Sequence, residues 1–159
     1  KKTIEEIEKC LKADLVYPAL VLALSIPDMA GKEKWPELSG NKQCKNRYCK
    51  WFDKYVDPDL NPLSYVYKDI DSAFNSNTCY VLRCSLLHAG ETDIGSEINV
   101  DNFVIDTSIN GMGGVLLRGG SDFVIKDGQW ELSPYLYIRG YMLIKYIVDG
   151  AKKFLLEIK

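Results

Sequence analysis

The chain has 159 residues and a mass of 18.0 kDa, enough for one domain to bury a core without disulfide or metal support. Apolar residues make up 47% and charged residues 26%, a balance typical of soluble folded proteins that excludes a disordered chain. The formal net charge of -2 excludes a generally basic coat for nucleic acid but allows a local basic patch.

No segment is typical of a membrane span or a secretory signal. The longest nearly uncharged run near the start, Leu15 to Pro27, is too short to cross a bilayer and contains two prolines. The five cysteines are an odd number, which favours reduced thiols over a disulfide framework. We therefore expect a cytoplasmic protein without a membrane partner.

The first part of the chain predicts two helices. Thr3 and Glu6 match a capping box, and an apolar stripe follows at steps of three and four residues. The stripe consists of Ile4, Ile7, Leu11 and Leu15. The run Ala19 to Ile26 is apolar on nearly all sides, which indicates a helix buried inside a bundle. We expect Pro27 and Gly31 to end it.

The middle of the chain predicts further helices joined by loops. In chain order we expect a loop over 32–41, a helix over 44–56, a loop over 57–62 and a short helix over 63–74. The next helix is expected to span Thr78 to Ala89, with Asn77 as its N-cap and Gly90 as its stop.

After Gly90 the pattern changes from helix to strand. The segment 102–109 is rich in Val, Ile, Phe and Thr, and 115–118 and 121–126 are short strand candidates separated by glycine-containing turns. We expect a small antiparallel β meander or hairpin near residues 100–128, inserted over about 97–130.

A long helix is expected to close the chain. Ser133 suits its N-cap and Pro134 its first position. Gly140 and Gly150 weaken this helix intrinsically, so packing must hold it. The sequence therefore predicts a mainly α fold, a bundle of four to six helices with a small β insertion, forming a single domain over 1–159.

The helix over 78–89 carries Arg83 and His88, which are separated by four residues; His88 is the only histidine in the chain. Cleavage of RNA by its own 2′-hydroxyl needs proton transfer and stabilisation of a crowded phosphorane. A histidine that titrates near neutrality can accept or donate the proton. An arginine offers a planar charged fork for phosphate oxygens. This chemistry requires no metal and no cofactor.

The Arg83-x4-His88 pattern resembles the R-x4–6-H motif of the HEPN superfamily (higher eukaryotes and prokaryotes nucleotide-binding domain), which lies on a late helix of an all-α bundle. The resemblance implies an endoribonuclease of single-stranded or structured RNA, with Arg83 and His88 as catalytic residues. It implies a homodimer that brings two motifs around one phosphate. It also implies a toxin or phage-defence effector, with a cognate antitoxin as a further partner.

Two other interpretations stay open. A non-catalytic HEPN-like helical module could bind nucleotide, RNA or a partner protein with the same bundle. Alternatively the motif is accidental, with His88 interacting with the carbonyls that end its helix and Arg83 forming an ordinary ion pair. Cys84 favours both alternatives, because the family often has Asn, Asp or His directly after the arginine.

Residues 32–54 combine basic and aromatic side chains. Seven Lys or Arg residues occur there against three Glu or Asp residues, so the segment is net +4 and the rest of the chain -6. Such side chains can hold phosphates and stack on unpaired bases. The candidate RNA-binding residues are Lys45, Arg47, Lys50, Trp51 and Lys54. The alternative is a solvated helix face with aromatic rings packed inward, as the four-residue spacing of Trp51 and Tyr55 indicates.

Two cysteine pairs, Cys44/Cys49 and Cys79/Cys84, have four intervening residues each, which suggests a metal site at first sight. Both pairs lie in predicted helices, where five positions correspond to a rotation of about 140° and the thiols point apart. We therefore expect no zinc site. The glycine-rich stretch 111–114 lacks the Lys-Ser/Thr of a P-loop and is explained by turns.

Overall fold

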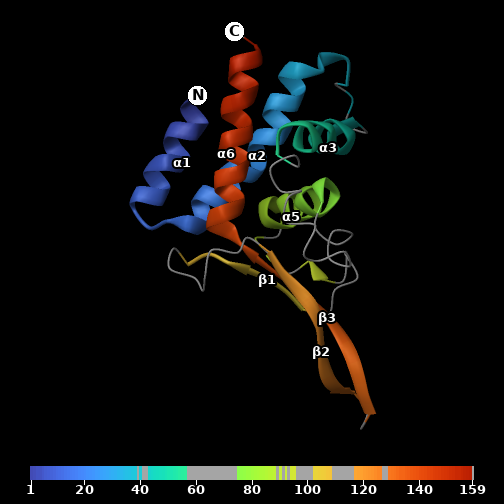
Figure 1. The fold of residues 1–159 in the computed structure, drawn as a ribbon. Helices are drawn as coiled ribbons and strands as arrows, with labels where there is room; N and C mark the ends of the chain where they lie inside the picture. The colour runs from blue at the N-terminus through green and yellow to red at the C-terminus, as the bar shows by residue number, and fades with distance from the viewer. Residues whose placement is uncertain are drawn as a thin grey trace.

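The computed structural model describes residues 1–38, 40, 43–56, 75–88, 90, 92, 94–95, 102–108, 117–126 and 129–158. The helices and strands are α1 (Lys2–Lys12), α2 (Val16–Lys34), the 3-10 helix η1 (Pro36–Leu38), α3 (Cys44–Tyr55), α5 (Ser76–His88), β1 (Asn102–Asp106), β2 (Leu117–Lys126), β3 (Gln129–Arg139) and α6 (Gly140–Glu157). Five α-helices thus form within these residues, so the predicted mainly α class is confirmed (Figure 1).

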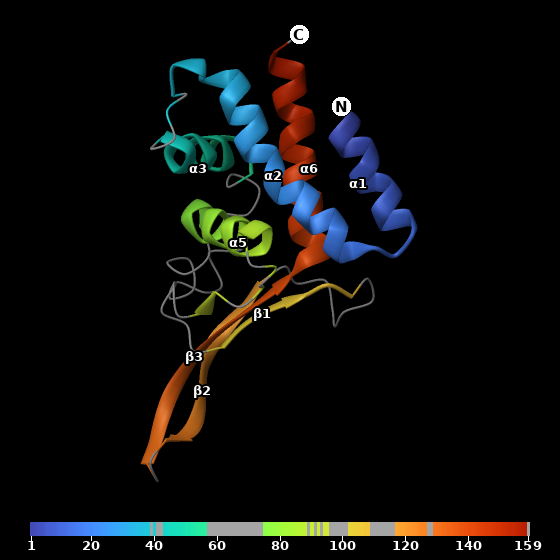
Figure 2. The same ribbon diagram turned by 180° about the vertical axis from the view of Figure 1, so that it is seen from behind.

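Helix α2 is the centre of the helical part. It contacts α1, α3, α5 and α6, and the two ribbon views show α6 running beside it (Figures 1 and 2). Its buried residues fall on several sides of the helix, as the nearly continuous apolar run predicts. The buried side chains Leu20 and Leu24 belong to the same core as Leu143 and Ile147 of α6. The prediction of a buried helix in the first third is therefore confirmed.

Helix α3 supplies the largest side chains of the core. Tyr48, Trp51 and Phe52 are fully buried. Trp51 packs against Phe154 of α6 with the ring centroids 6.4 Å apart. Three large aromatic side chains of this kind remove more apolar area from water than aliphatic ones would, so α3 is held mainly by packing.

The sheet has the strand order β1-β3-β2. Strand β2 pairs antiparallel with β3, with Phe123 opposite Leu132, whereas β1 pairs parallel with β3, with Val104 opposite Tyr137. Strand β1 covers only positions 135–139 of β3, near the helices. The rest of the β2–β3 ribbon extends away from the helical part (Figures 1 and 2).

Two predictions about the last third of the chain are wrong. Ser133 and Pro134 do not start a helix: they lie within β3, opposite Asp122 and Ser121, and α6 begins only at Gly140. A proline lacks the N–H that a central strand needs, but β1 pairs with β3 only from Tyr135 onward, so among the described strands Pro134 has a partner on one side only. The meander is also mixed, because β1 is parallel. The expected turns at 109–116 and 127–128 lie outside the described residues.

Two predictions about the ends of α1 and α2 also differ from the structure. Helix α2 continues through Pro27 and Gly31 to Lys34, because core packing outweighs the loss of one backbone hydrogen bond at the proline. Helix α1 has Lys1 as its N-cap and no side-chain capping bond, so the capping box of Thr3 and Glu6 does not form at this end.

The N-cap of α5 lies two residues before the expected one. Asn75 Oδ1 accepts a hydrogen bond of 3.1 Å from the backbone N–H of Thr78, in place of Asn77. Gly90, with φ of 71°, has the left-handed backbone typical of a residue that follows a helix. The helix at 44–56 is confirmed as α3, while the segments expected over 57–74 lie outside the described residues.

Helix α6 crosses the end of α3 at Gly150. An added Cβ there would lie 2.8 Å from the backbone oxygen of Tyr55 and 3.1 Å from Val56 Cγ2. Both distances are shorter than van der Waals contact, so only glycine allows this close approach of the two helices. The expectation that packing must hold α6 despite its glycines is consistent with this contact.

Substitution of Gly150 by Ala should destabilise the protein by about 1–3 kcal/mol, because the overpacking against backbone outweighs the gain of up to about 1 kcal/mol in helix propensity. Urea unfolding followed by circular dichroism measures the change. Gly40→Ala is the control, since among the described residues, its chain neighbours aside, no atom lies within 4 Å of its added Cβ, and it should change stability little. A Gly150→Ala variant more stable than wild type would contradict the packing argument.

Candidate functional site

The two residues of the R-x4-H pattern lie on α5 in different surroundings. The side chain of Arg83 is 20% exposed and extends toward α2, whereas His88 is exposed in the last turn of the helix. Five positions along a helix correspond to a rotation of about 140° and a rise of about 7.5 Å. Within one subunit, therefore, Arg83 and His88 leave α5 in different directions.

Arg83 belongs to a group of three charged residues, which we call the arginine–aspartate cluster: Asp28, Arg47 and Arg83. Asp28 Oδ1 accepts a hydrogen bond of 2.9 Å from Arg47 Nη2, and Asp28 Oδ2 accepts one of 3.1 Å from Arg83 Nη2. One carboxylate thus joins α2 to both α3 and α5. Among the described residues it is the only acidic group that pairs with either guanidinium, so the cluster has a net charge of +1.

Arg47 is the buried member of the cluster. It is 4% exposed, and its Nη1 donates to the backbone oxygen of Leu38. The hydrogen bond with Asp28, opposed by burial, raises the pKa of Arg47 above its usual range, so its charge is permanent. Gly31 makes this placement possible, since a Cβ at that position would lie 2.8 Å from Arg47 Cγ and 3.0 Å from the Arg47 backbone oxygen.

Arg83 is the more accessible member. Its Nη1 has only the sulfur of Cys84, at 3.8 Å, as a hydrogen-bond acceptor, and its Nε has no partner among the described residues. Burial lowers the pKa of Arg83, but the hydrogen bond to Cys84 and the charge of Asp28 outweigh burial and raise it. The guanidinium therefore stays charged, with part of its hydrogen-bonding capacity unused.

The five candidate RNA-binding residues of α3 have different positions. Lys45, Lys50 and Lys54 are exposed, whereas Arg47 and Trp51 are buried. Trp51 is fully buried, which agrees with the alternative of aromatic rings packed inward. The structure thus leaves three exposed lysines on this helix.

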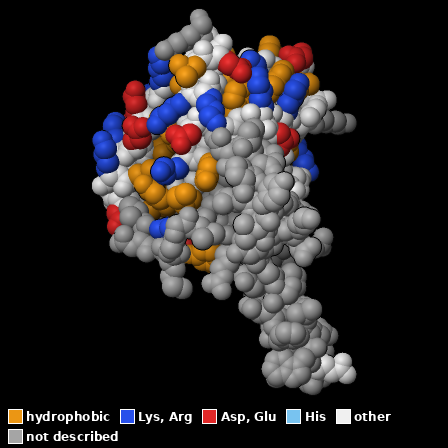
Figure 3. Space-filling view, viewed as in Figure 1, with side chains coloured by type: hydrophobic (Ala, Val, Ile, Leu, Met, Phe, Trp, Pro, Cys, Tyr) orange, Lys and Arg blue, Asp and Glu red, His pale blue; other side chains and the backbone are white. Residues whose placement is uncertain are grey.

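Two of these lysines have local partners. Lys50 Nζ lies 4.5 Å from the centroid of the Trp35 ring, in a cation–π contact. Lys54 Nζ lies 3.0 Å from a carboxylate oxygen of Glu157, which also pairs with Lys34. On the face that Figure 3 shows, basic and acidic side chains are interspersed over the helices. The coloured residues of that face form no continuous basic surface.

The thiols form no metal site within the described part of the chain. All five cysteines are free, and no group of three or more His, Cys, Asp or Glu side chains that could hold a metal ion occurs among the described residues. Burial raises the pKa of Cys79 well above its ordinary value, so this thiol stays protonated. Among the same residues no helix is both long and apolar enough to cross a bilayer.

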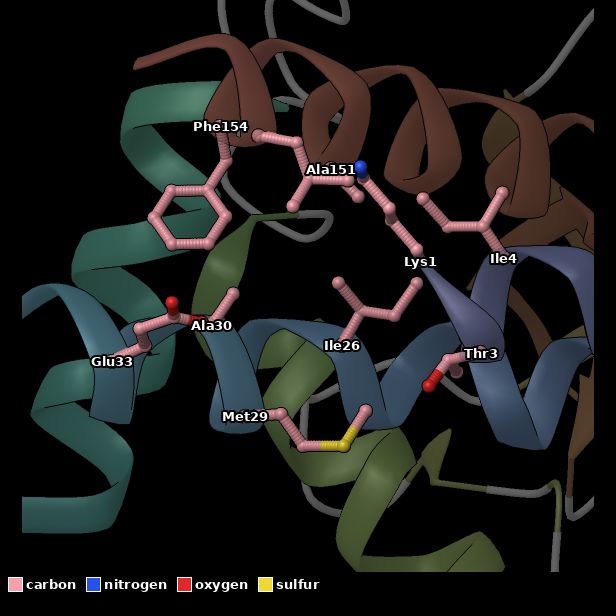
Figure 4. Close-up of a pocket in the computed structure, with 10 residues that line it drawn as sticks. Lys1, Thr3, Ile4, Ile26, Met29, Ala30, Glu33, Ala151 and Phe154 are labelled. Carbon is pink, nitrogen blue, oxygen red and sulfur yellow. The ribbon is translucent and has the colours of Figure 1, made fainter. Parts of the chain in front are cut away.

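A pocket of about 150 Å³ opens elsewhere, between α1, α2 and α6 (Figure 4). Its lining is mostly apolar, with Met29 and Phe154 on opposite sides and Lys1 and Glu33 among the polar residues. Neither Arg83 nor any other member of the arginine–aspartate cluster lines it.

Sequence reasoning missed Asp28. The signal was present, because Asp28 is the only charged residue between Leu15 and Gly31, in a run that otherwise predicts a buried helix. A charge in such a run needs a partner of opposite sign. The pattern could have identified Asp28 as a paired residue, although not which arginines it meets.

The chain matches no known protein family, curated protein sequence or solved structure.

The surroundings of Glu157 predict how the stability of the protein changes at acid pH. Hydrogen bonds lower the pKa of Glu157 from 4.5 to about 2; the bond from Lys34 has the largest effect, followed by those from Tyr55 and Lys54. A carboxylate with a lowered pKa in the folded state contributes stability above its unfolded pKa and loses it as the pH falls through the folded value. Glu157→Gln should therefore weaken the dependence of melting temperature on pH between about pH 4.5 and pH 2.

Thermal unfolding monitored by circular dichroism across this range measures the effect. Glu8→Gln is the control, because it removes an exposed carboxylate whose contact with Lys152 is longer, at 3.7 Å. Its pH profile should run parallel to that of wild type. A parallel profile for Glu157→Gln as well would show that the ion pairs around Glu157 contribute no stability.

Proposed function

We propose that this chain is a metal-independent endoribonuclease of HEPN type that cleaves single-stranded or structured RNA. The observation that carries the proposal is the surplus charge of the arginine–aspartate cluster beside an exposed histidine on the same helix. Two guanidiniums share the carboxylate of Asp28, so Arg83 keeps an attraction for anions, and it is 20% exposed. A phosphodiester is an anion of the geometry that a guanidinium binds best.

In the proposed reaction the 2′-hydroxyl of a ribose attacks the adjacent phosphorus, and the bond to the 5′-oxygen breaks. Arg83 holds non-bridging phosphate oxygens and stabilises the charge that develops on them. His88 takes the proton from the 2′-hydroxyl or gives one to the leaving 5′-oxygen. One histidine cannot do both in the same step, so the mechanism needs a second copy of the site.

We therefore propose a homodimer in which the α5 helices of two subunits approach one another. A two-fold axis near α5 would place the Arg83 of one subunit beside the His88 of its partner. This arrangement removes the difficulty that, within one subunit, the two side chains leave the helix about 140° apart. A cytoplasmic toxin or defence effector that a cognate antitoxin restrains is the biological role that goes with such an enzyme.

The second candidate is a non-catalytic helical module that binds nucleotide, RNA or a partner protein. The ion pair of 3.1 Å between Arg83 and Asp28 gives Arg83 a structural function within the fold, so a module of this kind keeps Arg83 without catalysis. The two candidates differ in one respect that can be measured: only the ribonuclease needs His88.

Cleavage of mixed-sequence RNA in the presence of a chelator should leave a 2′,3′-cyclic phosphate, or the derived 3′-phosphate, and a 5′-hydroxyl. His88→Ala should abolish cleavage with little change in melting temperature, because the side chain is exposed. Arg83→Ala should slow cleavage by on the order of 10²–10³. Gel assays with end-labelled RNA measure both effects.

Arg83→Lys tests the need for the guanidinium, and Lys12→Ala is the control for this prediction. Arg83→Lys should also fail, because a point charge does not replace the planar fork. Lys12 is exposed on α1, and its replacement by Ala should leave cleavage unchanged. Undiminished cleavage by both His88→Ala and Arg83→Ala would refute the ribonuclease, and RNA binding without cleavage by wild type would favour the module.

Sedimentation at tens of micromolar should show a dimer. A spin label on a cysteine introduced at position 87, beside His88 on the exposed end of α5, should report a short distance between subunits. The other cysteines require replacement by Ser first. A monomer, or a dimer whose labels lie far apart, would count against a shared catalytic site.

A further inference from the structure

Arg83 donates to Asp28, whose other carboxylate oxygen pairs with Arg47. We infer that Asp28 and Arg47 are positioning residues for Arg83, and that this arrangement prepares a site for one phosphate oxyanion of the RNA backbone. The inference rests on the proposed ribonuclease for its substrate class. It assigns Arg47 an indirect role, in place of the direct RNA contact that the sequence suggested.

Arg47 cannot itself reach a ligand in solution. Its side chain is 5% exposed, and its Nη1 and Nη2 donate to the backbone oxygen of Leu38 and to Asp28. What it contributes to a neighbouring site is one permanent positive charge next to the carboxylate. That charge compensates Asp28, so the carboxylate can orient Arg83 without neutralising the site.

Asp28 holds one end of the Arg83 guanidinium. It accepts from Nη2 at 3.1 Å, and among the described residues Nη1 has only the weak acceptor Cys84 Sγ, at 3.8 Å, which leaves it for an incoming oxygen. A side chain that is already held in one rotamer loses less conformational entropy on binding than a free one. Orientation of this kind also contributes to catalysis, because the charge must meet the phosphate in the transition state.

The experiment first measures binding of inorganic phosphate to the full chain from the rise in melting temperature, with chloride at equal ionic strength as the blank. Wild type should bind phosphate and Arg83→Met should not. Arg47→Met should weaken binding by on the order of tenfold, because Asp28 then neutralises Arg83. Arg47→Lys loses the same fork but keeps the charge, and it should bind within about threefold of wild type.

Comparison of Arg47→Met with Arg47→Lys separates the electrostatic role of Arg47 from a structural one. Both lose the hydrogen bond geometry of a buried arginine, so a purely structural role predicts equal effects on phosphate affinity. The double variant Asp28→Leu/Arg47→Met provides a second measurement. It restores the charge of +1 at Arg83 but removes the group that directs it, so phosphate affinity should recover.

In RNA cleavage by the double variant, KM and kcat should change differently. KM should return toward the wild-type value, while kcat should stay at least tenfold lower, because Arg83 is no longer oriented. Equal phosphate affinity of Arg47→Met and wild type would overturn the electrostatic part of the inference. A wild-type kcat in the double variant would overturn the positioning part.

The two proposals can fail separately. If wild type binds phosphate with the stated dependence on Arg47 but cleaves no RNA, the ribonuclease is refuted and the oxyanion site stands. If wild type cleaves RNA through Arg83 and His88 and the changes at Asp28 and Arg47 alter neither KM nor kcat, the ribonuclease stands and this inference is overturned. Absence of any phosphate binding by wild type also overturns it.

Discussion

A single carboxylate that meets two guanidiniums organises the structure around the candidate site. Asp28 lies on the central helix α2, and its two oxygens reach Arg47 on α3 and Arg83 on α5. The three helices that build the site are therefore tied by charge as well as by apolar packing. An isolated charge at any of these positions would be costly in a half-buried place, so the members depend on one another.

The same group joins the packing of the helices to the candidate site. Gly31 allows α3 to approach α2 so closely that Arg47 can reach Asp28, and Arg47 then compensates the carboxylate that holds Arg83. A residue of the core thus shares its carboxylate partner with a more exposed residue. The side chain of Arg83 is held by this partner although it is 20% exposed.

The general arrangement of helices was predictable from the sequence, but the site's partners were not. The nearly continuous apolar run located α2, and the expected cap and stop residues located α5 to within two residues. Local signals failed where tertiary contacts decide: Pro27 sits inside α2, and Pro134 sits in β3, although both resemble helix boundaries. The pairing of Asp28 with Arg83 joins residues 55 positions apart, and no local pattern encodes it.

The position of α2 has a consequence for how the chain folds during synthesis. Its apolar surface packs on α6, which begins at residue 140, more than 100 residues later. Until α6 leaves the ribosome, it cannot pack on this side of α2. Contacts between segments so far apart in the sequence also form slowly. The apolar surface of α2 that packs on α6 is therefore uncovered while the residues between the two helices are made, and a chain truncated before residue 140 should aggregate more readily than the chain that includes α6.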